Sequence, residues 1–86
     1  MIEKFLQYIS FQKRQSIHTQ SSYRNDLEQF ASYLTETYQI SDLTQADYHI
    51  IRSWIISLSE ANLQATSINR KIATLKSFYK FLVKQN

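Results

Sequence analysis

Hydrophobic residues recur along this chain at helical spacing, in four separate blocks. Intervals of three and four residues bring such positions onto one face of an α-helix. The first block predicts a helix over 2–13 and the second a helix over 17–37. Ser16 is the expected N-cap of the second helix, because a serine hydroxyl can accept from an early backbone N–H. The expected core positions are Ile2, Phe5, Leu6 and Ile9, then Tyr23, Leu27, Phe30 and Leu34.

The third and fourth blocks predict helices over 45–60 and 65–84, after a loop at 39–43. Thr44 is expected to start the third helix, with Asp47 three residues later as a weak capping-box partner. We find no strand pattern and no internal repeat, so the predicted fold is all-α, a compact four-helix bundle. The expected core positions are Ile50, Ile51, Trp54, Ile55 and Leu58, then Ile68, Ile72, Leu75, Tyr79 and Leu82.

Length and composition narrow the possible functions. The 86 residues are expected to form a single domain, 1–86, and contain no Gly, Pro or Cys. This composition argues against a disulfide scaffold, a phosphate-cradling loop and a dinucleotide site. His18 and His49 lack ligand spacing, so we expect no metal and no other cofactor. No apolar run could span a membrane and no signal peptide is evident, so a cytoplasmic protein is expected.

Charge is distributed unevenly along the chain. Residues 61–86 carry five basic and no acidic side chains, whereas residues 1–60 carry five basic and seven acidic ones. A helix with one apolar face and a basic, hydroxyl-rich opposite face suits a position between a core and a polyanion. Nucleic acid is therefore the first partner to consider. No paired carboxylates and no Ser–His–acid arrangement can be argued, so no enzymatic activity is expected from this chain by itself.

Polar residues mark two helical faces as candidate contact surfaces. On the fourth helix Arg70 and Thr74 fall opposite the apolar stripe, and Lys71 lies nearer the core edge, from which it can reach outward. On the second helix the N-terminal half is rich in hydrogen-bonding groups, and a helix N-terminus attracts phosphate. An ordinary solvated surface explains the face of the fourth helix equally well, and capping plus a polar surface is the better explanation of the second helix when that helix is taken alone. On the fourth helix the set is Thr66, Arg70, Ala73, Thr74 and Ser77, bordered by Asn69, Lys76 and Lys80, with Lys71 nearer the core; on the second helix it is Ser16, His18, Thr19, Ser21, Ser22 and Asn25.

Two longer motifs resemble a known family. The first is Ser16-x-x-Thr19-x-x-x-Tyr23-x-x-Asp26-Leu27-x-x-Phe30-x-x-Tyr33-Leu34, and the second is Ser67-Ile68-x-Arg70-Lys71-Ile72-x-x-Leu75-Lys76-Ser77-Phe78-Tyr79-x-Phe81-Leu82. Together they resemble the N-terminal core-binding, SAM-like domain of tyrosine recombinases and phage integrases, and the nearest likeness is to the Xer-type and mobile-element integrase branch. The resemblance covers essentially the whole chain. Family members often have glycine in the segments that enter the second and fourth helices, whereas this chain has no glycine. Before the fourth helix, Asn62 can take a left-handed cap conformation instead.

The resemblance implies a DNA-binding domain that forms half of a C-shaped clamp around duplex DNA, with the second and fourth helices at the major groove. The full enzyme would act through a 3′-phosphotyrosyl intermediate without metal or nucleotide, using a catalytic domain that follows this one. Other recombinase subunits in a tetrameric synapse are implied partners, and the fragment alone is expected to be monomeric. The matched contact positions are His18, Thr19, Ser21, Ser22 and Asn25, then Thr66, Ser67, Arg70, Lys71 and Thr74, with Tyr8 and Phe11 as subunit contacts.

Two other functions remain open from the sequence. One is a helical protein–protein interaction module without nucleic-acid binding, and the other is a small helix-turn-helix regulator. Binding that weakens steeply with salt would distinguish a DNA-binding domain from an interaction module. The long, well-separated second and fourth helices argue against the regulator, which needs a short recognition helix after a tight turn.

Overall fold

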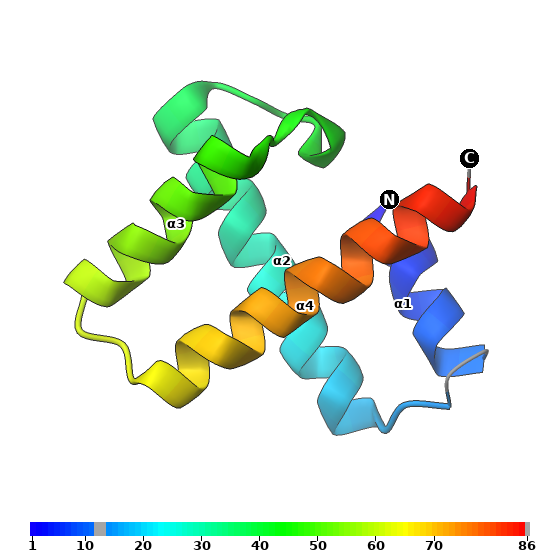
Figure 1. Cartoon of the computed structure of the whole chain (residues 1–86). Coiled ribbons are helices and arrows are strands. Elements are labelled where there is room, and N and C mark those ends of the chain that lie inside the picture. The colour runs from blue at the N-terminus through cyan, green and yellow to red at the C-terminus, as the bar shows by residue number, and fades with distance from the viewer. Residues whose placement is uncertain (12–13, 86) are drawn as a thin grey trace.

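Four α-helices and one short 3₁₀ turn make up the part of the chain that the computed structural model describes, residues 1–11 and 14–85. In order they are α1 (Ile2–Phe11), α2 (Ile17–Tyr38), η1 (Leu43–Gln45), α3 (Tyr48–Glu60) and α4 (Ala65–Gln85). In Figure 1, α4 crosses in front of α2, and α1 and α3 lie toward opposite ends of the molecule. The predicted all-α, four-helix class is confirmed.

The helix ends follow from local side-chain and backbone chemistry. Ser16 caps α2 as predicted, and its hydroxyl accepts from the Thr19 backbone N–H at 3.2 Å. The chain has no glycine, and among its described residues three others take left-handed backbone conformations: Arg14 at φ 52°, Gln39 at φ 56° and Asn62 at φ 66°. Asn62 was the residue expected to do so, since asparagine tolerates this region better than most side chains.

The predicted start of the third helix is wrong. Residues 43–45 form the separate turn η1, and α3 begins only at Tyr48. The reason is that two aspartates each cap their own helix start. Asp42 accepts from the Thr44 N–H at 2.9 Å, and Asp47 accepts from the Ile50 N–H at 3.0 Å. The last two residues of the predicted first helix, 12–13, lie outside the described residues, and the remaining predicted ends agree within one residue.

The core has two aromatic centres that are joined through α4. The Phe5 ring lies 5.5 Å from the Phe78 ring and 5.6 Å from the Phe81 ring, which joins α1 to α4. The Phe30 ring lies 4.9 Å from Trp54, which joins α2 to α3. The buried hydrophobic residues are Phe5, Leu6, Ile9, Leu27, Phe30, Leu34, Trp54, Leu75, Phe78, Phe81 and Leu82.

The buried face of α4 is wider than its predicted stripe. Ile68, Ile72 and Tyr79 are only half-buried, whereas Phe78 and Thr74 are fully buried. A single stripe is insufficient because α4 packs against both α2 and α3, and its C-terminal half also meets α1. The Tyr79 hydroxyl still has a structural role, because it donates to the Leu43 carbonyl at 2.6 Å and ties η1 to α4.

Candidate nucleic-acid interface

A buried carboxylate lies where α2 and α4 cross. Asp26 has no exposed surface, and three side chains of α4 donate to it. The Lys71 Nζ and the Arg70 Nη2 each lie 2.9 Å from its Oδ1, and the Thr74 hydroxyl lies 2.8 Å from its Oδ2. A buried charge is tolerated only when it is paired and hydrogen-bonded. The cluster therefore fixes which residues of α2 and α4 meet.

The cluster keeps Asp26 ionised. Burial by itself would raise the pKa of Asp26, but the hydrogen bonds from Arg70, Lys71 and Thr74 outweigh it and hold the pKa below its usual value. At neutral pH the cluster thus contains one carboxylate and two cations. One positive charge is left over at the helix crossing.

The two cations of the cluster differ in their access to solvent. The Lys71 side chain is 5% exposed, and its Nζ also donates to the Gln29 Oε1 at 2.5 Å. The Arg70 side chain is 47% exposed. Lys71 is therefore an internal counter-ion of Asp26, whereas Arg70 holds Asp26 with one edge of its guanidinium and reaches the surface.

Two of the predicted contact residues do not lie on the surface as expected. Thr74 was placed opposite the core and Lys71 was expected to reach outward, yet both are buried against Asp26. The helical wheel of α4 alone could not show this, because their partner lies on another helix. A signal was present in α2, where Asp26 precedes Phe30 by one turn on the core side. An acid at a core position calls for a cation from elsewhere.

The remaining predicted residues lie along two rows that lead away from the crossing. Ser22 is one helical turn before Asp26, and Thr66 is one turn before Arg70. In Figure 1 the N-terminal halves of α2 and α4 diverge downward from the place where the helices cross. The exposed members of the rows are His18, Ser21, Asn25, Thr66 and Asn69, and Thr19, Ser22 and Ser67 are half-buried.

No exposed carboxylate lies in either row. Residues 16–25 and 61–85 contain no acidic side chain, and the one acid at the crossing is the buried Asp26. Arg24 adds little free charge on α2, since both of its terminal nitrogens bond the carboxylate of Glu3 on α1, and Glu28 lies 3.8 Å away. Arg70 is therefore the cation that stands between the two polar rows.

The two aromatic residues considered as subunit contacts have different environments. Phe11 is 78% exposed at the end of α1. Tyr8 is half-buried, and its ring lies 5.0 Å from the Phe81 ring. Phe11 thus presents an apolar side chain to solvent, whereas Tyr8 packs largely within the domain.

In residues 1–11 and 14–85 no group of three or more His, Asp or Glu side chains could hold a metal ion. Over the same ranges, none of the helices has the length and apolar character that a membrane crossing requires.

These observations define a class of protein: an all-helical domain whose two long helices are joined by a buried ion cluster. The chain belongs to the family described as phage integrase, N-terminal SAM-like domain, whose sequence profile matches residues 2–86. This confirms the resemblance read from the two motifs.

The curated relatives are tyrosine recombinases. The chain is 39% identical to tyrosine recombinase XerC of Oceanobacillus iheyensis, over 98% of this chain and 27% of that protein. It is 38% identical to tyrosine recombinase XerC of Rickettsia canadensis, over 98% of this chain and 29% of that protein. The chain thus spans less than a third of the length of these relatives. No solved structure matches it significantly.

Proposed function

We propose that this domain binds duplex DNA through the N-terminal halves of α2 and α4, as the DNA-positioning part of a tyrosine recombinase. The observation that carries the proposal is the buried Asp26 cluster, which joins two acid-free polar rows and leaves the half-exposed Arg70 between them. Such a surface suits the phosphate backbone, which dominates the affinity of proteins for DNA. In the parent enzyme this domain would clamp the duplex at a recombination half-site opposite the catalytic domain.

The two cations of the cluster have different roles in this proposal. Lys71 stays on Asp26, and the solvent-facing edge of Arg70 donates to a phosphate oxygen. An arginine fork suits phosphate because two N–H groups can bind it side by side. Thr74 and Lys71 act from beneath the surface by holding Asp26, and neither contacts DNA. The remaining contacts come from His18, Thr19, Ser21, Ser22 and Asn25 of α2 and from Thr66, Ser67 and Asn69 of α4, which bond phosphates or base edges.

Contacts with other recombinase subunits belong to the same proposal. The exposed Phe11 at the end of α1 is the residue we assign to a neighbouring subunit in the synapse, since covering its ring with a partner would remove apolar surface from water. Tyr8 supports this end of α1 from within. The isolated domain is expected to be monomeric.

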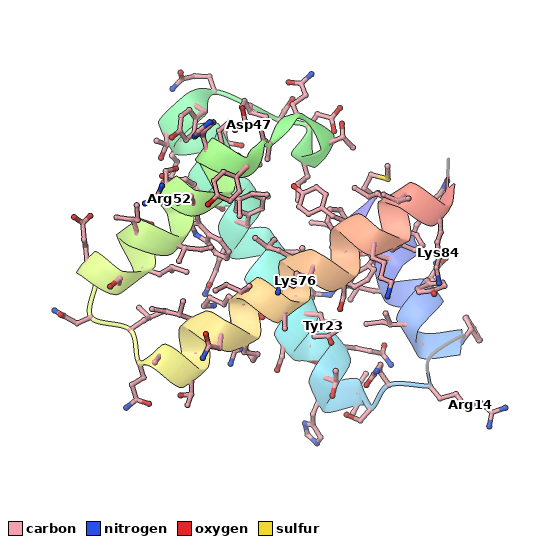
Figure 2. The ribbon with its side chains drawn as sticks, viewed as in Figure 1. Arg14, Tyr23, Asp47, Arg52, Lys76 and Lys84 are labelled. Atoms are coloured by element: carbon pink, nitrogen blue, oxygen red, sulfur yellow. The ribbon has the colours of Figure 1, made fainter. Side chains whose placement is uncertain are left out.

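Fluorescence anisotropy with a labelled duplex of about 20 base pairs, roughly two helical turns, tests DNA binding. We expect the association constant to fall steeply as salt rises from about 50 to 200 mM. Arg70→Ala should reduce the slope of log K against log salt by about 0.9, the value for one lost phosphate contact. Arg52→Ala is the matched control, because it removes the same charge from an exposed position on α3 (Figure 2) and should leave the slope unchanged.

A duplex affinity that does not depend on salt, or equal effects of the two arginine variants, would refute this assignment. The first outcome would favour the protein-interaction module, whose docking surface depends little on phosphate charge. Equal effects would mean that the domain responds only to its overall charge, and that the α2–α4 surface has no special role.

A further inference from the structure

A pocket of about 200 Å³ lies where α1, the start of α2 and the C-terminal half of α4 meet. Its lining combines polar and apolar surface: the rings of Tyr8 and Tyr23 are half-buried, whereas those of Phe5 and Phe81 are almost fully buried and expose little to an occupant. None of its lining residues belongs to the proposed DNA contacts. In Figure 2, Tyr23 and Lys84 lie on the side of α4 that faces α1.

The rim of the pocket is positively charged. Lys80 and Lys84 are exposed and one helical turn apart on α4, and Ser77 stands one turn further back with its hydroxyl. Among the residues that the structure describes, no acidic side chain lines the pocket. Lys84 extends along the rim, with its Nζ 5.9 Å from the centre of the Tyr8 ring. A pocket with two half-buried tyrosine rings is therefore bordered on one side by two cations that no carboxylate among the described lining residues balances.

We propose that this pocket binds an acidic peptide segment of a partner protein, with one apolar side chain inside and a neighbouring carboxylate between Lys80 and Lys84. The volume fits a single side chain, because a cavity of about 150 Å³ holds a benzene ring, whereas drug-sized ligands need about 300–1,000 Å³. Charge complementarity selects an acidic segment. Duplex DNA fits less well, because its bases are stacked and cannot insert a ring between the tyrosine side chains of the pocket.

Two-dimensional amide NMR of the domain tests this with defined probes. The probe is an acetylated and amidated tripeptide of sequence glutamate–phenylalanine–aspartate. Two matched peptides replace either the acids by glutamine and asparagine or the phenylalanine by alanine. We expect the first peptide to shift the amides of Tyr23, Ser77 and Phe81, and the other two to bind about fivefold more weakly or not at all.

Protein variants complete the test. Lys80→Ala combined with Lys84→Ala should weaken the acidic peptide about fivefold, and Ser77→Leu should block it by filling the pocket. Lys76→Ala removes an exposed lysine of the same helix that does not line the pocket, and it should change nothing. Each variant should first give an amide spectrum that matches the parent spectrum away from the substituted residues, which shows that its fold is unchanged.

Three results would overturn the proposal. The neutral peptide could bind as tightly as the acidic one, or the shifted amides could lie away from the pocket. Alternatively, the double lysine variant could lose duplex DNA affinity as Arg70→Ala does while leaving peptide binding unchanged. That last result would assign Lys80 and Lys84 to the nucleic-acid surface.

Discussion

Lys71→Met should destabilise the domain far more than Arg70→Ala, although both changes remove one cation from the same carboxylate. Methionine preserves the length and the buried apolar stem of Lys71, so the change tests the ammonium group alone. It removes the hydrogen bonds to Asp26 at 2.9 Å and to the Gln29 amide oxygen at 2.5 Å. Arg70→Ala removes a half-exposed side chain and leaves both of these bonds in place.

The magnitudes follow from burial. Removing one partner of a buried ion pair costs about 3–5 kcal/mol. Because Arg70 and Thr74 remain on Asp26, we expect about 2–4 kcal/mol for Lys71→Met. For Arg70→Ala we expect only about 0.5–1.5 kcal/mol, since solvent screens this half of the cluster and two donors remain. An 86-residue domain has a total stability of roughly 4–13 kcal/mol, so the first change endangers the fold and the second does not.

Urea unfolding followed by circular dichroism measures these differences, and the DNA salt slope supplies the second readout. At a temperature where Lys71→Met stays folded, it should keep the parent salt slope, whereas Arg70→Ala should lose about 0.9 of it. The double variant Asp26→Leu with Lys71→Met should recover much of the stability, because it removes the buried charge together with its counter-ion. If Arg70→Ala were the more destabilising change, or if Lys71→Met lowered the salt slope equally, the roles assigned to the two cations would be wrong.

Three further predictions concern the scaffold. Leu75→Ala should lower the free energy of unfolding by about 2–5 kcal/mol in urea, as a truncation in the core; a variant as stable as the parent would contradict its buried position. Burial, reinforced by the Asp42 carboxylate, raises the pKa of Tyr79 to about 12. The stability that the neutral Tyr79 hydroxyl contributes should therefore be complete below the unfolded pKa near 10 and be lost as pH rises through 12. A near-ultraviolet titration in which Tyr79→Phe leaves the highest tyrosine transition unchanged would refute this. Gln39→Gly should raise the thermal midpoint through a gain of about 0.5–1 kcal/mol, because glycine adopts the left-handed cap without strain, and a lowered midpoint would contradict that account.

The periodicity of apolar residues was enough to predict the four helices, because each segment shows a clear apolar face by itself. The serine N-cap of α2 and the left-handed Asn62 were also predictable, since both depend on chemistry within a few residues. The start of α3 was not. Asp42 and Asp47 can each cap a helix, and their competition left Thr44 inside a separate turn. Local rules identify both aspartates as possible caps, but they do not show which of the two begins the α-helix.

The candidate surface was predictable only in part, for a related reason. A helical wheel assigns one inward face to each helix, but α4 contacts three other helices on different sides. Thr74 points away from the apolar stripe of α4 and Lys71 lies at the edge of that stripe, yet both side chains face Asp26 on α2. Their burial depends on the crossing position of two helices whose contacting residues are more than forty positions apart. No pattern within α4 carries that information.

If the domain binds DNA as proposed, the presence of two cations on Asp26 allows binding and folding to proceed without competing for the same group. If Arg70 alone neutralised Asp26, a phosphate that attracted Arg70 would leave a buried carboxylate without its counter-ion, at a cost of several kcal/mol. Binding would then weaken the α2–α4 crossing on which the surface depends. Lys71 prevents this, because its buried ammonium stays on Asp26 whichever partner Arg70 takes. Consecutive helical residues point about 100° apart, so positions 70 and 71 can direct one cation toward solvent and the other toward the core. The adjacent pair Arg70–Lys71 therefore supplies one cation to solvent and one to Asp26, which neither residue could do alone at this crossing.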